Sequence, residues 1–190
     1  MAINLQLKKG TGISMRQFMD TMNKNKETFL DWYQRFSWET EEERSQIEAA
    51  VQQGGFQAFL LSAEWCGDVV RNVPVLFRVA EAVKLPVEVL VMEDHLDVMD
   101  QFLTMGGRAI PVFIICNKAG DVLGTWGPRP AHVQKIMIQF KQENPDREAT
   151  DYQDKIMVAR KEMLTQYGED TGYQQVIVHE LSDLFRQIQS

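Results

Sequence analysis

Cysteine is scarce in this chain, and long apolar runs are absent. Its 190 residues include two cysteines, Cys66 and Cys116, which are too few for the disulfide framework of a small secreted domain. No stretch approaches the ~20 consecutive apolar residues that a membrane-spanning helix needs. Residues 1–10 lack the apolar core of a secretory signal. We therefore expect a cytoplasmic protein with no membrane contact.

An excess of basic residues is also missing. The chain has 20 Lys and Arg against 27 Asp and Glu, a net charge of −7, which argues against nonspecific binding to nucleic acid or to an anionic membrane surface. The three histidines, His95, His132 and His179, are scattered, and there is no C-x-x-C pair, so no metal site is predicted. Neither a P-loop nor a G-x-G-x-x-G motif occurs, so we expect no nucleotide and no cofactor.

The composition is that of an ordinary folded domain, with 44% apolar and 25% charged residues. At this length we expect one domain: a core over 55–142, an N-terminal helical extension over 1–54 and a C-terminal one over 143–190. Apolar residues at helical spacing, with Ser14 as a cap and a capping box from Thr40 to Glu43, predict the N-terminal helices. The apolar faces of the tail helices need cover, from the N-terminal helices or from a second subunit, so the oligomeric state stays open.

The core alternates between strand and helix patterns. We expect strands at 56–62, 87–92, 111–116 and 121–126, and helices at 66–84, 96–105 and 130–142. The β-α-β start predicts a parallel strand pair with a right-handed crossover. The turn at 117–120, with a glycine for positive φ, predicts a hairpin. The fold class is α/β, a mixed sheet flanked by helices.

Cys66 stands where a buried strand passes into a helix. The first N–H groups of a helix lack internal partners, and the helix dipole puts partial positive charge there. That environment favours the thiolate, which is the reactive form of cysteine. Asp68 opposes it, because a second negative charge nearby disfavours ionisation. Cys66 is the candidate nucleophile, and an inert cysteine in a reused fold is the alternative.

Trp65-Cys66-Gly67, with a strand before it and Pro74 in the following helix, resembles the active-site segment of thioredoxins. The later Ile110-Pro111 strand start, the hairpin and Trp126-Gly127 agree with that family in their order. The resemblance covers about residues 55–140. It implies a thioredoxin-like fold, a cis bond before Pro111, and a peptide-binding groove. The groove residues that it implies are Trp65, Gly67, Asp68, Ile110, Pro111 and Trp126.

Three positions depart from the family pattern. Val69 stands where a dithiol thioredoxin has its second, resolving cysteine, and Asp68 stands where proline is usual. Leu60 occupies the place of the buried acid that the family uses as a proton relay. Because the resolving thiol and its proton relay serve one chemical step, we expect no closed dithiol–disulfide cycle.

The resemblance implies thiol–disulfide exchange through Cys66 alone. Cys66 would form mixed disulfides with protein disulfides or glutathionylated thiols, and an external thiol, such as glutathione, would resolve them. A redox-inactive adaptor that binds proteins at the Ile110-Pro111 groove is the alternative. A third interpretation comes from monothiol glutaredoxins, which hold an iron–sulfur cluster with one cysteine and glutathione.

Three further residues have simpler interpretations. Arg71 and Arg108 are candidates to flank the groove and hold a carboxylate, although solvated surface positions are the simpler interpretation. Cys116 lies well along its strand, so we expect a small buried apolar residue with no bridge to Cys66.

Overall fold

The computed structural model describes residues 3–189. One five-stranded sheet has the order β1-β3-β2-β4-β5. The central strand β2 pairs in parallel with β3 and antiparallel with β4, while β5 pairs antiparallel with β4 and β1 antiparallel with β3. The strands are β1 (Ile13–Ser14), β2 (Gln57–Ser62), β3 (Val87–Val91), β4 (Val112–Cys116) and β5 (Val122–Trp126). This confirms the expected mixed sheet.

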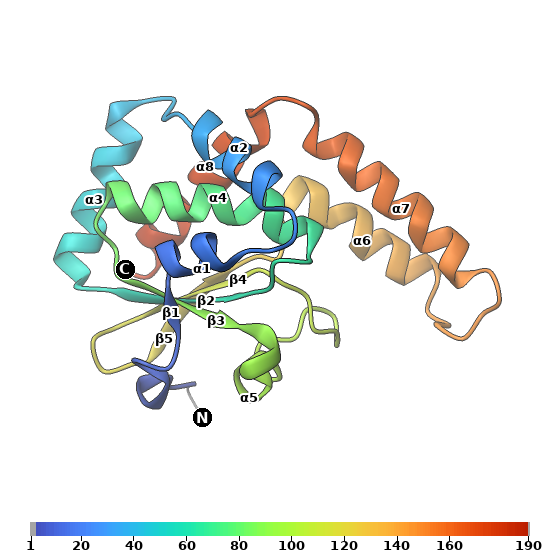
Figure 1. Ribbon diagram of the computed structural model, residues 1–190, viewed down its shortest axis with the longest axis horizontal. Helices are drawn as coiled ribbons and strands as arrows, with labels where there is room; N and C mark the ends of the chain where they lie inside the picture. Colours follow the sequence, from blue (N-terminus) through green and yellow to red (C-terminus); the bar gives the residue numbers. More distant parts are fainter. Residues whose placement is uncertain (1–2, 190) are drawn as a thin grey trace.

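Eight α-helices and two short 3-10 helices surround the sheet within the described residues. In Figure 1, helices α2, α3, α4 and α8 gather on one side of the sheet, and α6 and α7 run outward side by side. The α-helices are α1 (Met15–Thr21), α2 (Lys26–Arg35), α3 (Glu41–Gly54), α4 (Gly67–Ala82), α5 (Leu96–Met99), α6 (Ala131–Glu143), α7 (Tyr152–Tyr167) and α8 (Gly172–Gln187). None of these helices is long and apolar enough to cross a membrane.

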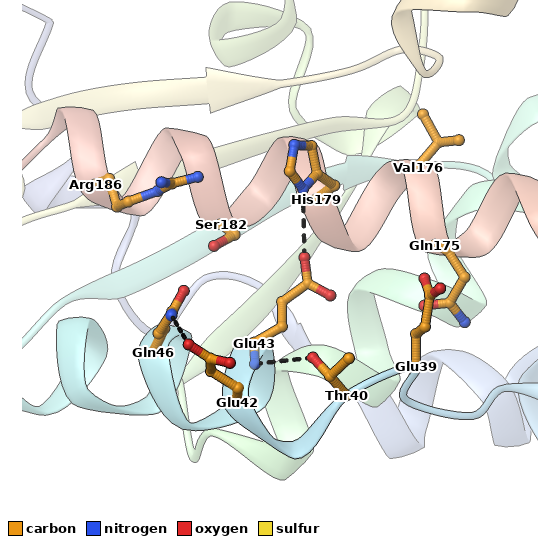
Figure 2. A pocket seen from close by; sticks show the side chains of 10 residues that line it. All are labelled: Glu39, Thr40, Glu42, Glu43, Gln46, Gln175, Val176, His179, Ser182 and Arg186. Atoms are coloured by element: carbon orange, nitrogen blue, oxygen red, sulfur yellow. Dashed lines mark hydrogen bonds and ion pairs between the residues drawn. The ribbon is translucent and has the colours of Figure 1, made fainter.

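Both predicted helix caps are present, but the capping box expected at α3 has only one of its two bonds. Ser14 and Gln17 satisfy each other's backbone N–H groups at the start of α1, a complete capping box. At α3, Thr40 Oγ1 accepts from Glu43 N–H, but the Glu43 side chain does not reach back. It points instead toward His179 of α8, whose Nδ1 lies 3.6 Å from Glu43 Oε1 (Figure 2). Glu43 therefore connects α3 to α8.

The helix expected at 96–105 is much shorter than predicted. Only Leu96–Met99 are α-helical. Met105 and Gly106 adopt positive φ, and Thr104 and Gly107 bond to each other through their backbones. This turn ends the helical pattern and turns the chain toward β4.

The two C-terminal helices, α7 and α8, are buried to different extents by the rest of the chain. In α8, Ile177, Leu181 and Phe185 are at most 1% exposed, because the helix packs on α3, α4 and β5. Helix α7 packs on α6 and leaves Met157 and Leu164 more than half exposed. The α6–α7 pair, which projects away from the sheet, thus presents exposed apolar side chains (Figure 1).

Candidate functional site

Cys66 occupies the N-cap position of α4, four residues beyond the last residue of β2. Its carbonyl accepts the first intrahelical bond, from Val70 N–H at 3.1 Å. The residue is partly buried, so its sulfur is neither enclosed in the core nor fully open. The sequence argument that put Cys66 at a strand-to-helix junction is confirmed.

The loop before β4 brings a cis peptide bond to the same place. Ile110-Pro111 is cis, as the resemblance implied. Cys66 Sγ donates to the Ile110 carbonyl oxygen at 3.5 Å. Ile110 is only 3% exposed, so little of its backbone is open to an added peptide strand. The binding of a peptide strand at Ile110 stays a prediction.

Gly127-Pro128 forms a second cis bond, which the sequence argument did not include. Gly127 has a φ of +120°, and a Cβ at this position would lie 2.3 Å from the Pro111 carbonyl oxygen. Only glycine fits this close approach. The loop after β5 therefore packs directly on the Pro111 loop.

A cleft of about 470 Å³ opens beside Cys66. Four of the groove residues that we expected line it, and α7 supplies further ones. The lining residues are Trp65, Cys66, Gly67, Asp68, Arg108, Ala109, Ile110, Arg129, Arg160, Met163, Leu164 and Tyr167. The contribution of α7 was missed, because the sequence does not show which surface that helix packs against.

Two of the expected groove residues do not line the cleft. Pro111 is buried behind Ile110. Trp126 is 7% exposed at the end of β5, and its indole N–H donates to Glu180 Oε2 at 2.7 Å. The structure places Trp126 in the packing of β5 on α8, and Trp126 does not line the cleft beside Cys66.

Trp65 stands at the mouth of the cleft and is 51% exposed. Its indole N–H donates to Glu93 Oε1 at 2.5 Å, which fixes the ring. Trp65 also lines a second, more apolar cleft of about 350 Å³, which includes Phe18, Met22 and Glu64. Trp65 therefore lines both clefts.

Asp68 belongs to a largely buried polar network. Its Oδ2 lies 2.6 Å from Arg129 Nη2, and the two side chains are 15% and 12% exposed. Tyr167 Oη donates to Asp68 Oδ1 at 3.1 Å and accepts from Asn72 Nδ2 at 2.8 Å. Asn72 also donates to the Pro128 carbonyl at 3.0 Å. The network ties the first turns of α4 to the end of α7 and to the second cis-proline loop.

The environment of Cys66 raises the pKa of its thiol. Partial burial of the sulfur is the largest cause, and the negative charge of Asp68 adds to it. The amides of Val69 and Asp68 at the helix start and the charge of Arg129 lower the pKa, but they do not reverse the balance. The amides at the helix terminus favour the thiolate, as expected, but burial of the sulfur outweighs them, so the net shift of the Cys66 pKa is upward.

Apolar residues occupy the positions of the resolving cysteine and of the buried acid that dithiol thioredoxins have. Val69 and Leu60 are fully buried apolar residues. Cys116 pairs across the sheet with Gln57, at the opposite end of β2 from Cys66, and both cysteines are free. Burial raises the pKa of Cys116 to about 11.

No group of three or more His, Cys, Asp or Glu side chains suited to a metal ion occurs among residues 3–189.

The two arginines considered from the sequence have different positions. Arg108 lines the cleft and binds Asp100 with two bonds, of 2.6 and 2.9 Å. Arg71 lies outside the cleft, and it is not a solvated surface residue either. Its guanidinium stacks on Trp32 at 4.2 Å and donates to the Gly168 carbonyl. Arg71 holds the helices together rather than a ligand.

A larger cleft, of about 600 Å³, lies between the start of α3 and α8 (Figure 2). Three of its ten lining residues are acidic: Glu39, Glu42 and Glu43. None of the ten residues that line it is a cysteine, and its His179 is engaged with Glu43. The chemically distinctive cleft is therefore the one at Cys66.

Comparisons with known proteins agree with this geometry. Two solved structures are similar. One is an HIV epitope-scaffold, with a TM-score of 0.61 and 13% sequence identity, and the match covers 92% of this chain and 93% of that chain. The other is a Pseudomonas aeruginosa protein of unknown function, with a TM-score of 0.57 and 14% sequence identity, and the match covers 92% of each chain. At these identities they show the fold alone. No curated protein matches. A family model described as thioredoxin matches residues 12–144, a wider range than the motifs suggested, so the chain belongs to the thioredoxin family.

Proposed function

We propose that this protein carries out thiol–disulfide exchange through Cys66 alone. The observation that carries the proposal is the position of the sulfur: it belongs to the N-cap residue of α4, lies beside the cis-proline loop and opens on a cleft of about 470 Å³. This arrangement holds a nucleophile next to a space where a disulfide can approach it.

The exchange conserves electrons within each step. The Cys66 thiolate attacks one sulfur of a disulfide, R–S–S–R′, and forms Cys66–S–S–R while R′–S⁻ leaves and takes up a proton from water. A second thiol, R″–SH, loses its proton and attacks the R sulfur, which releases the Cys66 thiolate and gives R–S–S–R″. The second thiol must come from outside, because Cys66 is the only thiol that lines the cleft and Val69 occupies the next turn.

The raised pKa sets the pace of the first step. A thiol whose pKa lies above neutral pH is mostly protonated, so only a small fraction of the protein can attack at any moment. Each thiolate is correspondingly more nucleophilic, which offsets part of that loss. We therefore expect slow capture of disulfides at neutral pH, followed by a long-lived mixed disulfide.

One observation favours a second candidate, the redox-inactive adaptor. The Cys66 thiol donates to the Ile110 carbonyl, and this bond stabilises the neutral form of the sulfur. An adaptor would use the cleft, with its α7 side chains, to bind a protein without covalent chemistry. The two functions differ in their dependence on the sulfur.

The test uses a neutral disulfide, bis(2-hydroxyethyl) disulfide, with glutathione as the second thiol. Exchange above the uncatalysed rate should be lost in Cys66→Ser and kept in Cys116→Ala, the matched control at the buried cysteine. If the Cys66→Ser protein matches the unmodified one, Cys66 is not a nucleophile and the adaptor is the better account.

A further inference from the structure

The charges around the Cys66 cleft differ from those of the whole chain. The chain has a net charge of −7, yet three arginines and one aspartate line this cleft. Arg108 comes from the loop before β4, Arg129 from the loop before α6, and Arg160 from α7. Three separate segments thus bring positive charge to the nucleophile.

Two of these arginines are already neutralised by the protein. Arg129 lies 2.6 Å from the Asp68 carboxylate, and Arg108 binds both oxygens of Asp100. Each of these guanidinium groups has its acceptor in place. They contribute shape and orientation to the cleft more than unsatisfied charge.

Arg160 is different. It is exposed on α7, and within residues 3–189 its one polar contact is with the sulfur of Met157, at 3.9 Å. No carboxylate lies within ion-pair distance of Arg160 among residues 3–189. Met163 and Leu164, on the same helix, supply apolar contact beside it. Arg160 is therefore an unneutralised cation in the lining of the cleft.

The second cleft that Trp65 lines has the opposite charge. The apolar cleft there includes Glu64 and Glu93, and no basic residue lines it. A ligand that enters both clefts meets the carboxylates of Glu64 and Glu93 in one and the guanidinium of Arg160 in the other. This asymmetry gives an approaching segment a preferred orientation.

We propose that Arg160 binds a carboxylate of the disulfide substrate, so that Cys66 selects disulfides with negative charge beside the reacting sulfur. The inference rests on the exchange proposed above and names the class of substrate. Such a carboxylate is present in an acidic protein segment and in a glutathionyl group. A planar guanidinium suits either one, because it donates two parallel bonds to a carboxylate.

The test compares disulfides that differ only in charge. Three short peptides carry Glu, Gln or Lys next to a cysteine capped as the hydroxyethyl disulfide, and a fourth is the Gln peptide capped with glutathione. The second-order rate of adduct formation at Cys66 is measured by mass spectrometry. An exposed ion pair is worth about threefold in rate, so the Glu peptide should react about threefold faster than the Gln peptide.

Variants on α7 assign the effect to one side chain. Arg160→Gln should bring the Glu-to-Gln rate ratio close to one, and Arg160→Glu should make the Lys peptide the fastest of the three. Lys161→Gln removes a neighbouring exposed charge that does not line the cleft, and it should leave the ratio unchanged.

Each outcome has a defined reading. If the unmodified protein reacts with the Glu and Gln peptides at equal rates, Arg160 does not select the substrate. The same follows if the Arg160→Gln protein keeps the Glu-to-Gln rate ratio of the unmodified one. Either result overturns the role of Arg160 and leaves the exchange itself standing. If no peptide forms an adduct, both proposals fail. A preference for the glutathione-capped peptide alone identifies the glutathionyl group as the source of the carboxylate, and a preference for the Glu peptide alone identifies a protein segment.

Discussion

Replacing Arg129 with methionine tests how the network beside Cys66 controls both stability and reactivity. Arg129 and Asp68 form a contact of 2.6 Å between side chains that are 12% and 15% exposed. Arg129→Met keeps most of the side-chain length but leaves the Asp68 carboxylate with only Tyr167 as a side-chain donor. The substitution should therefore lower the free energy of unfolding.

The size of the loss follows from the burial of the pair. Removing one partner of a fully buried pair costs about 3–5 kcal/mol, and an exposed pair is worth about 0–1 kcal/mol. This pair lies between the limits but nearer the buried one, and Asp68 keeps its bond from Tyr167. We expect a loss of about 2–3 kcal/mol, which for a chain of this length is roughly 5–10 °C in Tm.

The same substitution should change the chemistry of Cys66 in a defined direction. Without Arg129, the charge of Asp68 is no longer offset, so the pKa of the Cys66 thiol should rise further and alkylation at pH 8 should slow. Asp68→Asn should act in the opposite direction and speed alkylation. The double variant, Asp68→Asn with Arg129→Met, should lie between the two single variants and lose less stability than the sum of their losses.

Urea unfolding gives the stability, and iodoacetamide labelling of Cys66 gives the reactivity. Equal alkylation rates in all four proteins would show that these charges do not act on the sulfur. Strictly additive losses of stability would show that Asp68 and Arg129 are not coupled. Either result would refute the reasoning for this network.

Three further predictions follow from the two cysteines and Val69. Alkylation of Cys66 should still increase above pH 8.5, the ordinary value for cysteine, because its pKa is raised; a plateau below pH 7 would contradict the burial argument. Val69→Cys should shorten the life of the mixed disulfide and raise turnover, and unchanged turnover would mean that resolution is not limiting. Cys116, fully buried with a pKa of about 11, should resist iodoacetamide in the native protein and react only after unfolding.

Local patterns in the sequence predicted the framework of the site. The apolar run before Cys66, the glycine turn at 117–120 and the Ser14 cap each depend on residues a few positions apart, and all three appear in the structure. The cis bond at Pro111 came from the family resemblance. These features position Cys66 at the start of α4 and the Ile110 carbonyl beside it.

The remainder of the site depends on contacts between distant parts of the chain. Tyr167 meets Asp68 across 99 positions, and helical periodicity does not reveal such a partner. One signal was present: a carboxylate at the buried start of a helix needs a cation, so Asp68 pointed to an arginine such as Arg129. The sign of the pKa shift at Cys66 could not be predicted, because it depends on how deeply the folded chain buries the sulfur.

The most direct test of the central claim is the mass of the protein after it meets a disulfide with no other thiol present. With bis(2-hydroxyethyl) disulfide at pH 8, we expect a single hydroxyethylthio adduct on Cys66, which should persist for as long as no thiol is added and disappear when glutathione is supplied. A protein that gains no adduct under these conditions, or one that is modified equally after Cys66→Ser, would contradict the account.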